Sequence, residues 1–351
     1  MVIHQLVHTL SYGDAISGEV LALQRCFHAA GAESEIFAMN THPRLKGKTR
    51  DWRELKTDFS GTLVLHFSLG SPLSRTYLNA RRAKRCLIFH NLTGPEWFRG
   101  INPRVAADIE KGLQELPVLC TVTDVLIADS AFNARELAKI GFEAQVLELP
   151  VDFARWDLPK NMGIDALLKQ EGGIHILHTG RLAPNKCIED IIKTFYFLHH
   201  KIFKPSRLWL VGIDIDTELY SFSLKRLVDE LDLSDAVNFV GCLDDAELKS
   251  LYEGCSAYLC MSEHEGYCLP LIEAMYFGLP VAAYAATAVP ETVGEGGVLF
   301  YEKRHPEIAE LLFKIHADSD FKSALTAAGH SRVSPLSYKH FCLKVQRTIG
   351  W

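Results

Sequence analysis

The chain has 351 residues, of which 48% are hydrophobic and 23% are charged, and its formal net charge is −6. This length exceeds one ordinary domain and fits two α/β domains, each with a core of its own. The acidic balance argues against a general nucleic-acid binder, because such a protein needs basic surface to neutralise phosphates.

The cysteines and the longest apolar stretch indicate the cellular compartment of the protein. Nine cysteines are spread along the chain without a CxxC pair, and the first ten residues lack the features of a secretory signal. We therefore expect free thiols in a reducing cytoplasm. The longest uncharged stretch, 274–290, is interrupted by Gly278 and Pro280 and is too short for a convincing membrane span. The sequence thus predicts a cytoplasmic protein, at most peripheral at the inner face of a membrane.

The first half of the sequence alternates short apolar runs with segments of helical spacing. A strand at 2–10 leads into the glycine-containing loop SYGDAISGEV and a helix that stops at Gly31. Further strands are predicted at 34–39, 61–68, 86–91 and 125–130, and further helices at 77–84, 105–115 and 133–140. This alternation indicates a buried parallel sheet with crossover helices, whose ligand site is expected beyond the carboxyl ends of the strands.

A second alternation follows a proline-containing segment, LELPVD at 147–152, and a polar stretch at 157–173 that we interpret as the linker region. Strands are predicted at 174–180, 207–212, 237–241, 257–261 and 281–285, and helices at 188–199, 219–231 and 244–253. Beyond residue 301 the chain is expected to be helical. The predicted domains are 1–150 and 151–335, with a C-terminal helix at 336–351 that packs back on the first domain.

The stretch Ser262–Pro280, SEHEGYCLPLIEAMYFGLP, combines a turn with the start of a helix after the strand at 257–261. Pro270 suits the first turn of a helix, and the helix is expected to stop at Gly278. Free backbone N–H groups at such a helix end attract phosphate or sugar oxygens. Glu265 and Glu273 lie on the two sides of this turn, so both carboxylates can face one ligand; the alternative is an ordinary surface helix.

The segment HTGRLAPNK places two cations at the carboxyl end of a predicted strand. The strand ends at Thr179 and Gly180, and Arg181 and Lys186 follow before the helix at 188–199. A planar guanidinium and a mobile ammonium suit a diphosphate. The alternative is a solvated basic loop.

Two further loops leave strands of the first half. Gly13 and Asp14 lie where the first strand ends, although the loop lacks the complete GxGxxG pattern of dinucleotide binders. His90 ends the strand CLIFH and precedes NLTGPEWF. A lone histidine is more often structural than catalytic, but one at a strand exit that faces a cleft is a candidate.

Two clusters carry weaker signals. Cys255, Cys260, His264 and Cys268 match no paired zinc-knuckle spacing, and Cys260 falls inside a predicted strand, so no metal site is predicted. The densest basic run is either a solvated helix face or a contact with an anionic membrane surface; it comprises Arg75, Arg81, Arg82, Lys84 and Arg85.

In combination these motifs resemble a known family. EHEGYCLPLIEAM is similar to the E-x7-E motif of retaining glycosyltransferases of family four, which have the GT-B fold of two facing Rossmann-like domains. GRLAPNK resembles that family's Arg and Lys diphosphate clamp, SYGDAISGE resembles its first glycine loop, and FHNLTGP resembles the segment with its active-site histidine, here His90. The resemblance covers essentially the whole chain in the same order.

The resemblance implies a role for each matching residue. Glu265 would contact hydroxyls of the donor sugar, and Glu273 would bind the ribose. Arg181 and Lys186 would stabilise the departing nucleoside diphosphate beside Gly180. The remaining donor-binding positions are Gly13, Asp14, Val240, Gly241, Leu243, Gly266, Tyr267, Cys268 and Leu269. Cys268 departs from the family, because relatives commonly have glycine there.

The implied reaction is retaining transfer of a hexosyl group from a GDP- or UDP-linked sugar, with a leaning to GDP-mannose, to a glycan or lipid-linked acceptor in surface polysaccharide synthesis. No cofactor or metal is expected, since the side-chain cations and the helix end neutralise the leaving group. The acceptor would dock on the first domain near Gly13 and His90. Two alternatives are a nucleotide-sugar 2-epimerase, which shares the fold and the donor, and a non-catalytic subunit of a glycan-assembly complex.

Overall fold

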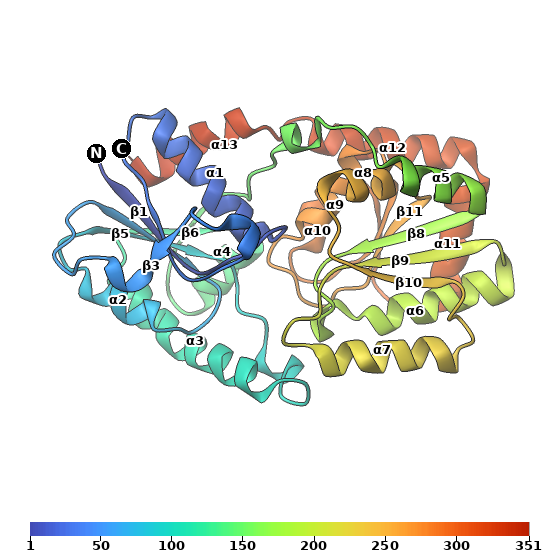
Figure 1. The fold of residues 1–351 in the computed structure, drawn as a ribbon, viewed down its shortest axis with the longest axis horizontal. Helices are drawn as coiled ribbons and strands as arrows, with labels where there is room; N and C mark the ends of the chain where they lie inside the picture. The colour runs from blue at the N-terminus through green and yellow to red at the C-terminus, as the bar shows by residue number, and fades with distance from the viewer. Residues whose placement is uncertain (351) are drawn as a thin grey trace. The chain divides into compact units, whose positions relative to one another are not determined.

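The structure is a computed structural model that describes residues 1–350, so Trp351 of the predicted C-terminal segment lies outside the described residues. The chain forms two compact units, shown in Figure 1. Unit 1 comprises Met1–Arg99, Pro103–Asp152 and residues 336–350, and unit 2 comprises Gly100–Asn102 and Phe153–Pro335.

Unit 1 is built on a seven-stranded sheet of order β3-β2-β1-β4-β5-β6-β7, in which every strand pair is parallel. The strands are β1 Ile3–Leu10, β2 Ile36–Thr41, β3 Arg50–Asp51, β4 Thr62–Phe67, β5 Lys84–Phe89, β6 Val125–Ala128 and β7 Gln145–Val146. The helices are α1 Ala15–Ala29, α2 Leu73–Asn79, α3 Pro103–Thr121, α4 Ala131–Lys139 and α13 Tyr338–Val345, with short turns η1 Pro43–Leu45, η2 Trp52–Glu54, η3 Pro95–Trp97 and η7 Gln346–Gly350.

Alternate residues of the central strands of unit 1 enter two different cores, because successive side chains of a strand point to opposite faces. Leu65 and Leu87 pack with residues of α2 and α3. Val64 and Ile88 pack with residues of α1 and α13 on the other face. The near-continuous apolar runs of the sequence reflect this burial on both faces.

The C-terminal helix belongs to unit 1, as predicted. Phe341 and Val345 of α13 share a core cluster with Leu23 and Phe27 of α1, and Figure 1 shows the two helices side by side. Because residues 153–335 lie between the two parts of unit 1 in the sequence, unit 1 is discontinuous.

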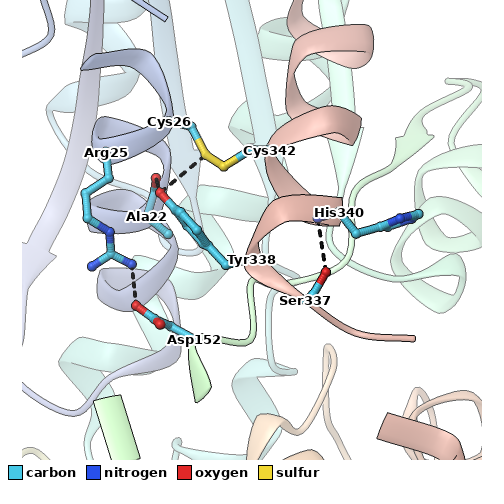
Figure 2. Close-up of a disulfide and its surroundings, with 8 residues drawn as sticks. All are labelled: Ala22, Arg25, Cys26, Asp152, Ser337, Tyr338, His340 and Cys342. Atoms are coloured by element: carbon cyan, nitrogen blue, oxygen red, sulfur yellow. Dashed lines mark hydrogen bonds and ion pairs between the residues drawn. A yellow bond between two sulfur atoms is a disulfide. The ribbon is translucent and has the colours of Figure 1, made fainter. Parts of the chain in front are cut away.

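The expectation of free thiols is wrong for two cysteines. Cys26 of α1 and Cys342 of α13 form a disulfide, with Cα atoms 5.7 Å apart, within the about 4.4–6.8 Å that a disulfide spans. Figure 2 shows Tyr338 beside it, with its hydroxyl donating to the Ala22 carbonyl at 3.0 Å. The two cysteines are separated by 316 positions in the sequence, so no local spacing could have revealed the pair.

Unit 2 is built on a six-stranded parallel sheet of order β10-β9-β8-β11-β12-β13. The strands are β8 Ile174–Thr179, β9 Ser206–Val211, β10 Val237–Gly241, β11 Ala257–Cys260, β12 Val281–Tyr284 and β13 Val298–Phe300. The helices are α5 Met162–Glu171, α6 Ile188–Phe197, α7 Glu218–Glu230, α8 Asp245–Gly254, α9 Leu269–Tyr276, α10 Val289–Val293, α11 His305–Ala317 and α12 Ser319–Val333, with short helical segments η4 Phe153–Trp156, η5 Pro184–Lys186 and η6 Leu198–Ile202.

The predicted α/β fold with two parallel sheets and a returning C-terminal helix is confirmed, while three local predictions are wrong. Gly18 lies inside α1, because α1 starts directly after Asp14, which caps it. Lys84 starts β5 rather than ending a helix, so the basic run lies on α2, a turn and a strand instead of one helix face. The stretch 157–173, interpreted as a linker, contains α5.

Among residues 1–350, no helix combines the length and the apolar character that crossing a membrane requires.

Candidate functional site

Unit 2 has a topological switch point between β8 and β11, which are neighbours in its sheet. From β8 the chain moves outward through β9 and β10, and then it returns to β11 and moves the other way through β12 and β13. Parallel strands share one carboxyl edge, and ligands of open α/β sheets bind outside that edge at the switch point. The loops that follow β8 and β11 there carry Lys186 and Glu265.

Lys186 and Glu265 form an ion pair at this switch point. The Lys186 Nζ lies 2.7 and 2.6 Å from the two carboxylate oxygens, and the side chains are 21% and 7% exposed. Burial opposes ionisation of Glu265, but the adjacent ammonium outweighs it and lowers the carboxyl pKa. Burial likewise opposes the charge on Lys186, and Glu265 outweighs it and raises the lysine pKa. Both groups are therefore charged at neutral pH.

The loop that carries Glu265 is fixed by two side chains that the sequence analysis did not single out. Asn185 of η5 accepts from Glu263 N at 2.9 Å through its backbone carbonyl and donates from its side-chain amide to the His264 carbonyl at 3.0 Å. The Thr287 hydroxyl accepts from Glu265 N at 2.8 Å. Asn185 could have been found from the sequence, because it stands next to Lys186 in the motif GRLAPNK. Thr287 could not, because it follows β12 with no recognisable pattern around it.

Cys268 directly precedes α9 in the left-handed region, with φ of 72°. Non-glycine residues pay about 1–3 kcal/mol for such a conformation, which is the physical reason that glycine suits this position. The thiols of Cys260 and Cys268 and the Glu265 carboxylate offer ligand atoms within 4.8 Å of one another, a group that does not include Cys255 or His264. A hydrogen bond to Cys260, together with burial, raises the pKa of the Cys268 thiol.

Glu273 lies on α9 and is buried. It accepts a hydrogen bond from the Tyr252 hydroxyl at 2.8 Å and lies 3.3 Å from the Arg155 guanidinium. Burial raises its pKa in spite of the nearby Arg155. Tyr252 and Arg155 were not identified from the sequence, because they come from α8 and η4, far from Glu273 along the chain.

Other predicted donor-binding residues follow the same sheet edge. Arg181 is exposed after β8 and donates to the Ile215 carbonyl at 2.8 Å. Gly180 and Gly212 approach so closely that a Cβ on Gly212 would lie 1.8 Å from the Gly180 oxygen. The remaining positions are half-buried or buried beside the ends of β10 and β11: Val240, Gly241, Leu243, Gly266, Tyr267 and Leu269.

In unit 1, the predicted residues separate into surface and interior positions. Gly13 and Asp14 are exposed, and the Asp14 carboxylate caps α1 by accepting from Ser17 N at 2.9 Å. His90 is buried, with its side chain 1% exposed, so the exposed remainder of this residue is backbone. The imidazole therefore points into unit 1, toward His66 and Asp129.

The C-terminal half of the chain matches a known protein family. Residues 163–332, just under half of the chain, match the model of glycosyl transferases group 1.

Curated relatives match about half of the chain at low identity. The chain is 24% identical over 168 residues to O-antigen chain mannosyltransferase B of Escherichia coli, covering 47% of this chain and 43% of that protein. It is 26% identical over 172 residues to a GDP-mannose:cellobiosyl-diphosphopolyprenol alpha-mannosyltransferase of Xanthomonas oryzae, covering 48% and 44%. The chain thus spans less than half the length of these relatives.

Solved structures match over nearly the full chain. HepE of Anabaena, in complex with UDP-glucose, has a TM-score of 0.75 at 16% identity over 99% of both chains. Sucrose-phosphate synthase of Thermosynechococcus elongatus has a TM-score of 0.75 at 18% identity, covering 99% of this chain and 97% of that one. In fold the chain is a GT-B protein, and in sequence it resembles O-antigen mannosyltransferases.

Proposed function

We propose that this chain is a retaining hexosyltransferase that takes its sugar from a nucleotide-sugar and passes it to a glycan or lipid-linked acceptor. The observation that carries this proposal is the ion pair of Lys186 and Glu265 at the switch point of β8 and β11. A charged lysine beside the start of α9 suits a diphosphate, and a carboxylate beside it suits sugar hydroxyls. The match of residues 163–332 to glycosyl transferases group 1 supports the same reaction class.

In the proposed reaction, the acceptor oxygen attacks the anomeric carbon on the face from which the diphosphate departs. Negative charge then develops on the leaving oxygen, and Lys186 and Arg181, which both follow β8, are the cations that neutralise it in this proposal. Preorganised donors of this type are each worth about 3–4 kcal/mol of barrier. Glu265 holds the sugar, and Glu273 accepts hydrogen bonds from the ribose. No cofactor takes part, because these cations neutralise the leaving group.

GDP-mannose is the donor that we propose first. The support is sequence resemblance, since the curated relatives include mannosyltransferases and one of them is named for GDP-mannose. The solved structure of HepE was obtained with UDP-glucose, so UDP-sugars form the second class to test. The acceptor would bind on unit 1, and the product would belong to surface polysaccharide synthesis.

Titration calorimetry of the full chain with GDP, UDP and their sugars tests the donor assignment. We expect GDP-mannose to bind, and Lys186→Ala to weaken GDP binding about 10–100-fold, as loss of a charge-assisted hydrogen bond does. Lys169→Ala is the matched control, because Lys169 pairs with Asp165 at 2.6 Å on the exposed face of α5. Absence of binding for every nucleotide would refute the proposal.

Product analysis tests the reaction type. With GDP-mannose and a polyprenyl-diphosphate glycan, we expect a new glycosidic bond whose anomeric configuration by NMR equals that of the donor. Release of an epimerised sugar in the absence of any acceptor would instead identify an epimerase and overturn the transferase proposal.

A further inference from the structure

Four polar side chains form a row across the face of the unit 1 sheet that α1 covers. Gln5, His66, His90 and Asp129 come from β1, from β4 and from the ends of β5 and β6, which are consecutive strands in the sheet. Each of the four lies two positions after an apolar residue that faces α1, and therefore on the same face of the sheet: His66 follows Val64, and His90 follows Ile88. All four are at least nine-tenths buried. A polar row inside an apolar layer is costly unless its groups are satisfied.

The hydrogen bonds along this row fix which ring nitrogens carry protons. The Gln5 amide nitrogen donates to the Val20 carbonyl at 3.0 Å, so its oxygen faces His66 and accepts from Nε2 at 3.0 Å. The His90 Nδ1 donates to the Asp129 carboxylate at 3.3 Å. The other nitrogens, His66 Nδ1 and His90 Nε2, then lie 3.0 Å apart with their lone pairs directed to one place. With Asp129 ionised, two lone pairs at this distance require a cation between them, either a proton or a metal ion.

Glu19 of α1 brings a carboxylate to the same place. It is 0% exposed, and neither of its oxygens has a hydrogen-bond partner among residues 1–350. One oxygen lies 3.6 Å from His66 Nδ1 and 3.4 Å from His90 Nε2. A proton shared between the two rings would satisfy the histidines but would give this buried carboxylate only an ion pair at 3.4 Å and no hydrogen bond. A metal ion would satisfy all three groups.

The spacing of the three ligand atoms fits a tetrahedral ion. Ligands about 2.0–2.1 Å from zinc stand about 3.3–3.4 Å from one another, and the three distances here are 3.0, 3.4 and 3.6 Å. Both histidines also hold the outer partners that metal-binding histidines have, a carboxylate in Asp129 and an amide oxygen in Gln5.

We propose that Glu19, His66 and His90 bind a divalent transition metal ion, with Zn²⁺ in first place, at a structural site inside unit 1. The ion holds α1 to the centre of the sheet through Glu19. In this assignment the His90 imidazole is a metal ligand, and only the His90 backbone is left to contact a substrate. The metal ligands belong to unit 1, whereas Lys186 and Glu265 belong to unit 2, so metal binding and nucleotide binding can be measured separately.

Metal content and cobalt spectroscopy of the full wild-type chain test the proposal without any variant. After removal of metals with a chelator, we expect one equivalent of Zn²⁺ to bind and to raise the thermal midpoint of unit 1. Co²⁺ should give the intense visible bands of a tetrahedral nitrogen and oxygen site. Near-ultraviolet thiolate-to-cobalt bands would place the ion at a group that contains cysteine, either Cys260 with Cys268 or Cys187, and would overturn the proposal. If neither Zn²⁺ nor Co²⁺ bound, the cation between His66 and His90 would be a proton, and the proposal would also be overturned.

Variants then locate the site. Gln5→Leu removes only an outer partner and is expected to weaken Zn²⁺ binding about 10–100-fold, and His66→Gln should weaken it further. Cys268→Gly, which alters one of the two ligand groups that contain cysteine and glutamate, is the matched control and should leave binding unchanged. Equal affinity in wild type and both unit 1 variants would refute the assignment, and nucleotide binding need not be measured for that conclusion.

Discussion

Replacing Lys186 by methionine tests whether the ion pair at the switch point is buried enough to govern the stability of unit 2. The substitution keeps the length of the side chain and removes the charge, so Glu265 loses the group that both of its oxygens accept from. Removing one partner of a buried pair costs about 3–5 kcal/mol, because the other charge stays buried. The 21% exposure of Lys186 favours the lower end, about 3 kcal/mol.

Lys169→Met provides the comparison. Its pair with Asp165 has the same 2.6 Å separation, but the lysine is 75% exposed and the pair lies within one helix, so its loss should cost about 0.3–0.5 kcal/mol. Near the midpoint, 1 kcal/mol corresponds to about 2–4 °C for a domain of 150–250 residues. We therefore expect Lys186→Met to lower the midpoint of unit 2 by about 6–12 °C and Lys169→Met to lower it by about 1–2 °C.

Differential scanning calorimetry of the full chain measures both variants, since it can resolve separate transitions of the two units. The double variant Lys186→Met/Glu265→Leu should recover most of the loss, because no buried charge remains. The pKa of Glu265 is lowered in the folded state, so its contribution is present above pH 4.5 and is lost as the pH falls through the folded pKa. The loss of stability in Lys186→Met, relative to the wild type, should therefore become smaller as the pH falls. The reasoning would be refuted if the two lysine variants lowered the midpoint equally. It would also be refuted if the double variant lost as much stability as the single substitutions Lys186→Met and Glu265→Leu added together.

Three further outcomes are expected. Glu273→Gln should leave the midpoint of unit 2 equal or higher, because burial raises the pKa of this carboxyl and penalises its charge, yet it should weaken nucleotide binding about tenfold or more by calorimetry. Cys268→Gly should stabilise unit 2 by about 1 kcal/mol or less in thermal unfolding, since relief of the left-handed strain is offset by the greater chain entropy of glycine, and a clear loss would show that the thiol is needed. Cys26→Ser should lower the free energy of unfolding of unit 1 by about 2–4 kcal/mol under non-reducing conditions, whereas Cys242→Ser, at an exposed free thiol, should not; a reducing agent should abolish the difference.

Much of the fold could be predicted from the sequence, because buried parallel strands are short apolar runs between helical segments. The strand at 237–241 was predicted with the bounds of β10, and the edge of the unit 2 sheet that carries Lys186 and Glu265 followed from the strand ends. Strands of two residues, such as β3 and β7, give no such run, and their existence depends on a neighbour to pair with.

The contacts within the site could not be predicted, since they join segments far apart in the sequence. Tyr252 reaches Glu273 from another helix, and Thr287 reaches the Glu265 backbone from beyond β12. The sequence pattern does not single out the row of Gln5, His66 and His90, because polar residues that follow alternating apolar residues are also common at ordinary strand ends. The register of three strands was needed to place these side chains together.

The discontinuity of unit 1 has a consequence for synthesis on the ribosome. Residues 153–335 emerge complete before residues 336–350 exist, so unit 2 has all of its chain while unit 1 still lacks α13. Until then Leu23 and Phe27 of α1 have no Phe341 or Val345 against them, and Cys26 lacks its native partner Cys342. The earlier half of the nascent protein is thus the later half to finish folding, and chaperones have their longest access to the α1 side of its sheet.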